Sequence, residues 1–348
     1  METPVYTLTC FLALERLARG RFLPAVVWSS MATLVRPDGV IVLLVVGFFV
    51  AGRLRGDLRG TLHSVWPMFV LIPTGVTLHA LYFHSLAPHS AIAKAAAYPV
   101  DPVANVSTYL GRMFLTWRSG LVIYALSVLG MTRLRDRSRE LMPFATWYAV
   151  YHAAFMLRAP LFDWYLHPPL VVLTLFAALG LLAAPRWVIR RSHAHLVRAQ
   201  ISAGAVLLVA LLIALPGYYR ARRRGQWYED HVRARAGLWL SSHASSGSLV
   251  FTESLGYIGY QTSHRFVDWP GLVSRDVPTL LRRNNGEGRT NSFDLIIAHF
   301  HPDYLALRDS EWGGLSPKVK APYKLCAEFP TPSRDLGSTY LIAGVICP

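Results

Sequence analysis

The stretch Leu34-Val35-Arg36-Pro37-Asp38-Gly39-Val40 interrupts a long apolar region of the sequence. Before it, the run from Phe22 to Val35 carries no charged residue, and after it the next charge is Arg53. Two apolar runs joined by a charged, turn-forming tetrad predict a helical hairpin whose tip emerges at a membrane surface, because non-helical backbone in hydrocarbon must be satisfied by protein or water. An ionisable pair at such a break is also a candidate functional site. The stretch therefore predicts an integral membrane protein with a polar site at one face.

The composition of the rest of the chain agrees with this interpretation. Of 348 residues, 53% are hydrophobic and 16% are charged, whereas soluble domains carry about 25% charged residues. The apolar runs lie within residues 1–217, and residues 218–348 have the composition of an ordinary water-soluble domain. We therefore predict an α-helical multi-pass membrane protein, with a transmembrane domain over 1–217 and a small extracytoplasmic α/β domain over 218–348.

The apolar runs predict about eight membrane spans. Several of them are shorter than the ~20 residues of a straight span, so amphipathic ends or a thinner bilayer must make up the difference. The predicted spans are Pro4–Leu14, Phe22–Val35, Val40–Gly52, His63–Phe83, Ser119–Met131, Leu141–Leu157, Pro169–Ala184 and Ile201–Leu215.

Alternate loops between these runs are rich in arginine. The basic loops contain Arg16, Arg53, Arg133 and Arg186 with their neighbours, and the positive-inside rule places such loops in the cytoplasm. The turn at Arg36, the 84–118 loop and the C-terminal domain then share the outer side of the cell membrane. The same distribution argues against nucleic acid as a partner, because much of the net charge of +15 sits in short membrane loops.

Two further segments leave alternatives open. Asp101 before Pro102 predicts a helix start, and the helix that follows either lies flat at the interface or packs its apolar stripe on other spans. Cys326 and Cys347 either form a disulfide, if the C-terminal domain faces an oxidising compartment, or remain two buried thiols.

The C-terminal region reads as an α/β domain. A helix from Trp227 to His243 leads into a strand at 248–252, and the short apolar run Phe293–Ala298 predicts a second buried strand. A closing hairpin is expected from Tyr323–Phe329 and Thr339–Ile346. The motif His299-Phe300-His301-Pro302-Asp303 resembles a metal-ligand pattern, but a third protein ligand is missing, so solvent-facing histidines are favoured and we predict no metal. No cofactor can be assigned.

The order of motifs resembles the multi-pass GT-C glycosyltransferases that use polyprenyl-phosphate sugars, a group that includes protein mannosyltransferases, aminoarabinose transferases and arabinofuranosyltransferases. Each motif is short, and the resemblance depends on their order over most of the chain. The matching segments are Glu2-Thr3-Pro4-Val5-Tyr6, Leu34 to Gly39, Pro88-His89-Ser90-Ala91-Ile92-Ala93-Lys94, Asp163-Trp164-Tyr165-Leu166-His167-Pro168, and Gly256 to Leu272.

This resemblance implies transfer of a sugar from a polyprenyl-phosphate donor to an acceptor outside the cell, with the lipid bilayer as the other partner. Such chemistry needs a carboxylate that deprotonates the acceptor and cations that hold the leaving phosphate. The expected catalytic residues are Asp38 and Asp163. The expected substrate-binding residues are Arg36, Lys94, His89, Tyr165 and His167.

Each of these roles has a structural alternative. Arg36 and Lys94 can snorkel to the interface, Asp38 can serve the turn, and Asp163 can pair with Arg158. In the GT-C group the catalytic acid precedes the segment that matches Glu2-Thr3, so we expect this chain to be inactive alone. The alternative function is a non-catalytic membrane protein whose outer domain binds a partner or a glycan.

Overall fold

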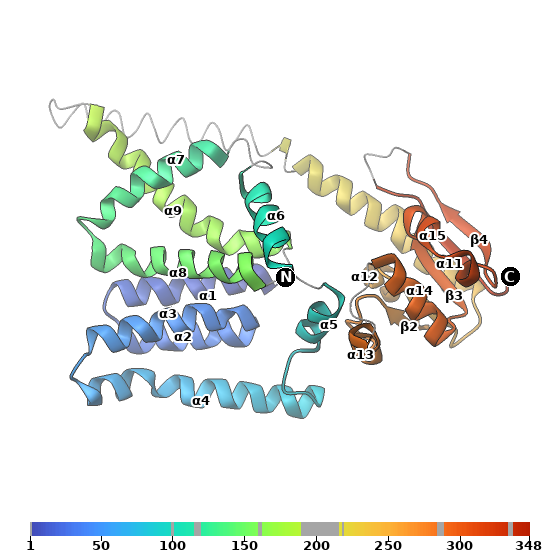
Figure 1. The fold of residues 1–348 in the computed structure, drawn as a ribbon, viewed down its shortest axis with the longest axis horizontal. Coiled ribbons are helices and arrows are strands. Elements are labelled where there is room, and N and C mark those ends of the chain that lie inside the picture. The colour runs from blue at the N-terminus through green and yellow to red at the C-terminus, as the bar shows by residue number, and fades with distance from the viewer. Residues whose placement is uncertain are drawn as a thin grey trace. The chain divides into compact units, whose positions relative to one another are not determined.

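The computed structural model describes residues 2–98, 101–114, 120–158, 162–188, 216, 217, 219–283, 289–332 and 337–348. Contacts divide the chain into a helical unit, Met1–Ala87 with Val100–Val209, and a C-terminal unit, Pro88–Pro99 with Ala210–Pro348. The predicted combination of a helical region with a small C-terminal sheet domain is confirmed (Figure 1).

Long helices that lie side by side form the helical unit (Figure 1). The predicted hairpin is present as two helices joined by the 3-10 turn η1 over the Arg36 tetrad. In chain order, the elements are α1 (Glu2–Ala18), α2 (Phe22–Val35), η1 (Pro37–Gly39), α3 (Val40–Arg53), α4 (Leu58–Phe83), α6 (Pro102–Phe114), α7 (Gly120–Met131), η2 (Thr132–Leu134), α8 (Ser138–Arg158) and α9 (Asp163–Val188).

Two of these helices are long and apolar enough to cross a bilayer, namely α4 and the segment Trp164–Leu182 of α9. Helix α2 is apolar but shorter. The other predicted spans are helical where the structure describes them, and the predicted span Ile201–Leu215 lies outside the described residues. About eight spans therefore remains a prediction.

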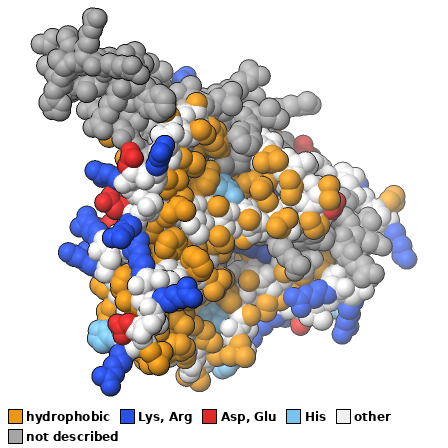
Figure 2. Space-filling view, turned by 60° about the vertical axis from the view of Figure 1, so that its left-hand side comes forward, with side chains coloured by type: hydrophobic (Ala, Val, Ile, Leu, Met, Phe, Trp, Pro, Cys, Tyr) orange, Lys and Arg blue, Asp and Glu red, His pale blue; other side chains and the backbone are white. Residues whose placement is uncertain are grey.

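Helix α4 exposes its apolar side chains along most of its length, and Ser64 and Pro67 are its buried residues. The helix contains Pro67 and Pro73 in its interior. Proline inside a water-exposed helix costs roughly 3 kcal/mol, but proline is more frequent in transmembrane helices than in soluble ones. Figure 2 shows apolar side chains covering the flank of the helical unit.

The core of the helical unit contains several large aromatic side chains. Tyr6, Trp147, Tyr151 and Phe176 are buried together with aliphatic residues of α1, α2 and α3. Helices α7 and α9 approach closely at Gly130, where a Cβ atom would lie 1.8 Å from the carbonyl oxygen of Phe176. Only glycine allows this approach.

The short helix before α6 does not belong to this unit. Helix α5 (His89–Ala97) packs against α13 (Asp276–Arg283) of the C-terminal unit. Ala93 and Ala96 of α5 are buried there, and the Tyr98 ring lies 5.0 Å from the Trp269 ring. The capped start of α6 is confirmed, because Val103 N donates to Asp101 Oδ1 at 3.0 Å. The apolar side chains of α6 differ in burial. Tyr109 is buried against α8, whereas Val103 is exposed.

A five-stranded mixed sheet of order β2-β1-β3-β5-β4 organises the C-terminal unit. Strands β2, β1 and β3 are parallel, while β5 runs antiparallel to both β3 and β4. The predicted hairpin of β4 and β5 is confirmed. The strands are β1 (Leu249–Thr252), β2 (Arg265–Asp268), β3 (Tyr304–Arg308), β4 (Lys324–Phe329) and β5 (Tyr340–Gly344).

Helices connect and cover these strands. A π-helical turn, η3 (Glu229–Arg233), leads into α11 (Ala234–His243), so the predicted helix before β1 is confirmed. The remaining helices are α12 (Leu255–Tyr260), α14 (Arg289–Phe300), α15 (Asp309–Gly314) and α16 (Pro317–Lys320).

The prediction of a strand at Phe293–Ala298 is wrong, because this run lies inside α14. A short apolar run has the same appearance in a buried strand and in a buried helix face. Here Phe293, Ile296 and Ile297 have helical spacing and are buried against the sheet.

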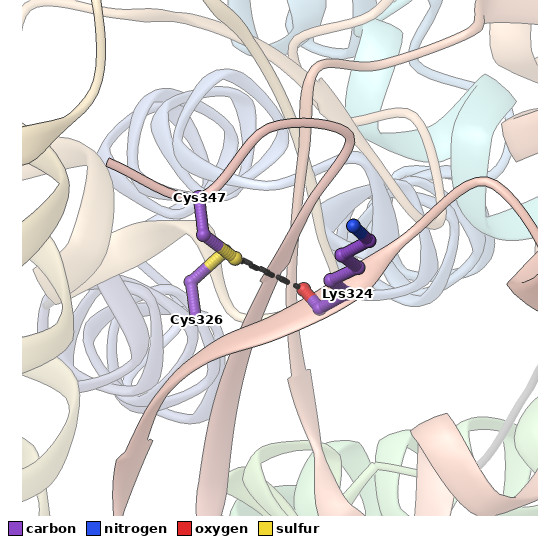
Figure 3. The surroundings of a disulfide bond; sticks show 3 residues. All are labelled: Lys324, Cys326 and Cys347. Atoms are coloured by element: carbon purple, nitrogen blue, oxygen red, sulfur yellow. Dashed lines mark hydrogen bonds between the residues drawn. A yellow bond between two sulfur atoms is a disulfide. The ribbon is translucent and has the colours of Figure 1, made fainter.

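A disulfide joins Cys326 of β4 to Cys347. Figure 3 shows this bridge with the Lys324 carbonyl oxygen, which lies 3.6 Å from Cys347 Sγ. An oxidised sulfur has no hydrogen to donate, so this approach is a contact between the two atoms. Of the two alternatives for these cysteines, the structure contains the disulfide.

Candidate functional site

Arg36 lies at the point where α2 ends and is 4% exposed. Its backbone is extended, as expected for a residue before proline. The turn that follows brings Asp38 back toward it, so that Arg36 Nε donates to Asp38 Oδ1 at 3.0 Å. Gly39 allows this tight turn, since a Cβ there would lie 2.3 Å from the Ala32 carbonyl group.

Residues from α1, α8 and α9 enclose this pair. The Arg36 guanidinium lies 4.8 Å from the ring centroids of both Tyr6 and Tyr165, a distance at which cations are attracted to aromatic faces. Arg36 Nη1 also lies 3.4 Å from Thr3 Oγ1. We call these residues, with Asp38 and Tyr151, the Arg36 cluster.

Tyr151 connects α8 to the turn and to α9. Its hydroxyl lies 3.3 Å from Asp38 Oδ2 and 3.1 Å from the Tyr165 carbonyl oxygen. The two carboxylate oxygens of Asp38 therefore have different partners, a guanidinium and a phenol. Such an arrangement holds the carboxylate in one orientation.

Burial raises the pKa of the Asp38 carboxyl, and Arg36 and Tyr151 offset this effect only in part. A carboxylate with a raised pKa is a better proton acceptor. A buried ion pair costs desolvation energy that its own attraction only partly returns, so such pairs are weak evidence for a purely stabilising role.

The opposite end of the helical unit has different chemistry. Arg53 donates to the carbonyl oxygens of Leu17 (2.7 Å) and Arg139 (2.5 Å), which ties the ends of α1 and α3 to the start of α8. Glu15 pairs with Arg16 and Arg19. The basic loops predicted from the sequence meet at this end wherever the structure describes them, and Figure 2 shows lysine and arginine side chains gathered along one edge of the surface.

The structure brings together three of the predicted site residues, Arg36, Asp38 and Tyr165. His167 lies on α9 and is exposed. The side chain of Asp163 lies outside the described residues, although its backbone begins α9. His89 and Lys94 lie on α5, in the C-terminal unit.

Three members of the Arg36 cluster were not singled out from the sequence as site residues. Thr3 and Tyr6 stand inside or next to a matched motif, and that position was the available signal. Tyr151 lies 113 residues from Asp38, and nothing in the sequence around it indicates this contact.

Among the described residues, no group of three or more candidate metal ligands is found at the His299 motif or elsewhere. The motif begins inside α14, whose last two residues are His299 and Phe300, and does not follow a strand. Asp303 is used structurally, because its carboxylate accepts a hydrogen bond from Leu249 N at 2.8 Å.

Comparison with known proteins assigns no activity to the chain. Residues 219–343 match a family model described as a domain of unknown function (DUF8728). No curated protein matches the chain, and no solved structure does. The matched region contains β1 to β4 and all of β5 except its last residue, Gly344.

Proposed function

We propose that the chain is a membrane glycosyltransferase-like protein for transfer of a sugar from a polyprenyl-phosphate donor to an acceptor outside the cell, and that it is inactive alone. Helix α4 supports the membrane placement. Its 26 residues extend over about 39 Å, more than the ~30 Å hydrocarbon core of a bilayer. Its apolar surface is exposed, and soluble monomers rarely expose large contiguous apolar patches.

Two independent features support the orientation. The arginine-rich loops at the Arg53 end indicate the cytoplasmic side, which leaves the Arg36 end outside. The Cys326–Cys347 disulfide suits an oxidising compartment outside the cytoplasm. In this proposal the Arg36 cluster and the C-terminal unit are both extracytoplasmic.

The proposed reaction uses the two charges of the Arg36 cluster in sequence. The donor phosphate competes with Asp38 for the Arg36 guanidinium, whose planar fork suits phosphate oxygens. Asp38 is then released as the base that takes the proton of the acceptor hydroxyl. The acceptor oxygen attacks the anomeric carbon, the bond from that carbon to the phosphate oxygen breaks, and its electron pair leaves with the phosphate. The observation that supports this proposal best is the pairing of Arg36 with Asp38, whose carboxyl has a raised pKa.

The test is binding of undecaprenyl monophosphate to the full chain in lipid nanodiscs. Asp38→Asn removes the competing carboxylate, so we expect about tenfold tighter binding of the phosphate. Arg36→Lys removes the fork and is expected to weaken binding about tenfold. Arg59→Gln changes an exposed arginine at the other end of the unit and should leave binding unchanged. Equal affinities for wild type, Asp38→Asn and Arg36→Lys would refute the assignment.

A second candidate is a non-catalytic membrane protein whose outer domain binds a partner or a glycan. The observation that favours it is that Arg36 and Asp38 already neutralise each other. This candidate predicts no binding of undecaprenyl monophosphate by the wild-type chain, so the same binding experiment separates the two functions.

A further inference from the structure

The path of the chain through the sheet creates a switch point between β1 and β3. From β1 the chain passes through α12 to β2 on one side, and from β2 it returns through α13 and α14 to β3 on the other side. Open sheets with parallel strands bind ligands outside the carboxyl ends of the strands at such a point. The carboxyl ends concerned are Thr252 of β1 and Arg308 of β3.

Charged side chains gather at these two strand ends. Arg308 donates from Nη2 to Glu253 Oε2 at 2.8 Å and from Nη1 to Glu311 Oε1 at 2.7 Å. Ser254 Oγ donates to the same oxygen of Glu253 at 2.7 Å. The Arg308 and Glu253 side chains are 25% and 19% exposed, so a ligand can reach both.

The π-helical turn η3 adds a second set of groups. Arg233 donates to Glu229 at 2.5 Å, and its guanidinium lies 5.1 Å from the Tyr228 ring centroid. Burial raises the pKa of Tyr228, and the charges of Arg233 and Arg308 oppose this effect. The Nε atom of Arg233 is buried without a hydrogen-bond partner among the described residues. Short π-helical turns are frequent at functional sites.

The charges of this group select the class of ligand. Two arginines and three glutamates leave a net charge of about −1, with donors and acceptors interleaved. An anion would meet three carboxylates, and a cation would compete with two guanidinium groups. A neutral molecule with many hydroxyl groups can donate to the carboxylates and accept from the arginines without either cost.

We propose that the carboxyl ends of β1 and β3 form a binding site for a neutral saccharide, held by hydrogen bonds to Glu253 and Arg308. Hydroxyl groups of the saccharide replace part of the hydrogen bonding between Arg308 and Glu253. Tyr228 and Ser254 lie at the sides of the proposed site. Its identity as the acceptor of sugar transfer rests on the function proposed above, whereas its binding does not.

The test is saturation-transfer NMR on the full chain in nanodiscs, without any polyprenyl phosphate. The probes are methyl α-mannoside, trehalose and maltotriose as neutral saccharides, with galacturonate and glucosamine as charged comparisons. We expect at least one neutral probe to bind more tightly than both charged ones. Glu253→Gln, which keeps the shape of the side chain, should weaken that binding about tenfold, because it replaces a charge-assisted hydrogen bond.

Glu328→Gln provides the matched control, since Glu328 is exposed on β4. Thermal unfolding of each variant shows whether the fold is retained, and Ser254→Ala gives a milder change if Glu253→Gln proves unstable. Absence of binding by all three neutral probes overturns the proposal, as does binding that neither Glu253→Gln nor Ser254→Ala reduces. A chain that binds saccharide but no undecaprenyl monophosphate refutes the proposed transferase while this site stands.

Discussion

The two units direct their apolar side chains in opposite ways. In α4 of the helical unit, Phe69 and Val70 are exposed over more than half of their surface. In α13 of the C-terminal unit, Val277 and Leu281 are buried while Arg282 is exposed. The hydrophobic effect favours burial only where the alternative is water. The difference supports the proposal that the helical unit has lipid as its solvent and the C-terminal unit has water.

Each unit also contains an arginine held by carboxylate, and the settings differ. Arg36 is buried between two tyrosine rings and pairs with one aspartate. Arg308 is partly exposed and bonds to two glutamates. The arrangement at Arg36 suits a site where a ligand displaces the buried aspartate. The arrangement at Arg308 suits a site at the exposed carboxyl ends of the strands.

The strongest test of whether the two units have different solvents is to remove a phenyl ring from each unit. Phe251 is fully buried between Phe293 and the rest of the sheet core, so Phe251→Ala should cost roughly 3–5 kcal/mol. Phe69→Ala removes a lipid-facing ring and should cost less than about 1 kcal/mol, because no protein cavity forms. Amide hydrogen exchange in nanodiscs measures both unfolding free energies. A cost at Phe69 equal to that at Phe251 would mean that α4 packs against protein.

Removing the disulfide tests the compartment assigned to the C-terminal unit. The bridge closes a sequence separation of 21 residues, and its loss through Cys347→Ala should destabilise this unit by roughly 2–4 kcal/mol. In intact cells an impermeant maleimide should label the wild-type chain only after an impermeant reductant has been added. Labelling without reduction would show free thiols and remove this support for an outer location.

Placing a charge on each unit gives a third test. Val70→Arg at the middle of α4 should reduce membrane insertion by roughly 2.5–3.5 kcal/mol. Tyr260→Arg, at an exposed position of the C-terminal unit, should change its stability by no more than about 0.5 kcal/mol. Insertion is measured by glycosylation mapping, and stability by denaturant unfolding. Normal insertion of the Val70→Arg chain would contradict the lipid-facing assignment.

The smallest effect concerns alkaline pH in the C-terminal unit. Burial raises the pKa of Tyr323 from 10.0 to about 12, and its hydroxyl donates to the Pro302 carbonyl oxygen at 2.8 Å. The neutral phenol is therefore favoured in the folded state, so its contribution is complete below pH 10 and is lost as the pH rises toward 12. Tyr323→Phe should lower the unfolding free energy by about 1 kcal/mol at neutral pH. The unfolding free energy of this variant should also fall less steeply above pH 10 than that of the wild type. An unchanged alkaline slope would contradict this role.

Local patterns predicted several elements correctly. The tetrad at Arg36 predicted a turn between two helices, and Asp101 predicted the start of α6. Both features depend on neighbouring residues, through proline geometry and side-chain capping. The β4–β5 hairpin also depends on short-range pairing. The prediction at Phe293–Ala298 failed because a short run with five apolar residues does not show whether the segment forms a strand or a helix that covers the sheet.

The candidate site was predicted only in part, because only some of its contacts join residues that are close in the sequence. Arg36 and Asp38 are two residues apart, and their contact follows from the turn itself. Lys94 and His89 were assigned to the same site because their segment matches a GT-C motif, and the structure has both on α5, which packs with α13 in the C-terminal unit. The packing of Ala96 in one buried cluster with Val277 and Leu281 of α13 joins residues that are far apart in the sequence.

By itself, the sequence determined where helices begin and turn, and which part of the chain has the composition of a water-soluble domain. These properties follow from local sterics, capping and the balance of apolar and charged residues. Tertiary structure decided that Tyr6, Tyr151 and Tyr165 enclose Arg36, and that Arg308 meets Glu253 at the switch point of the sheet. Such contacts join residues that are far apart in the chain, and they exist only because packing of whole helices and strands brings them together.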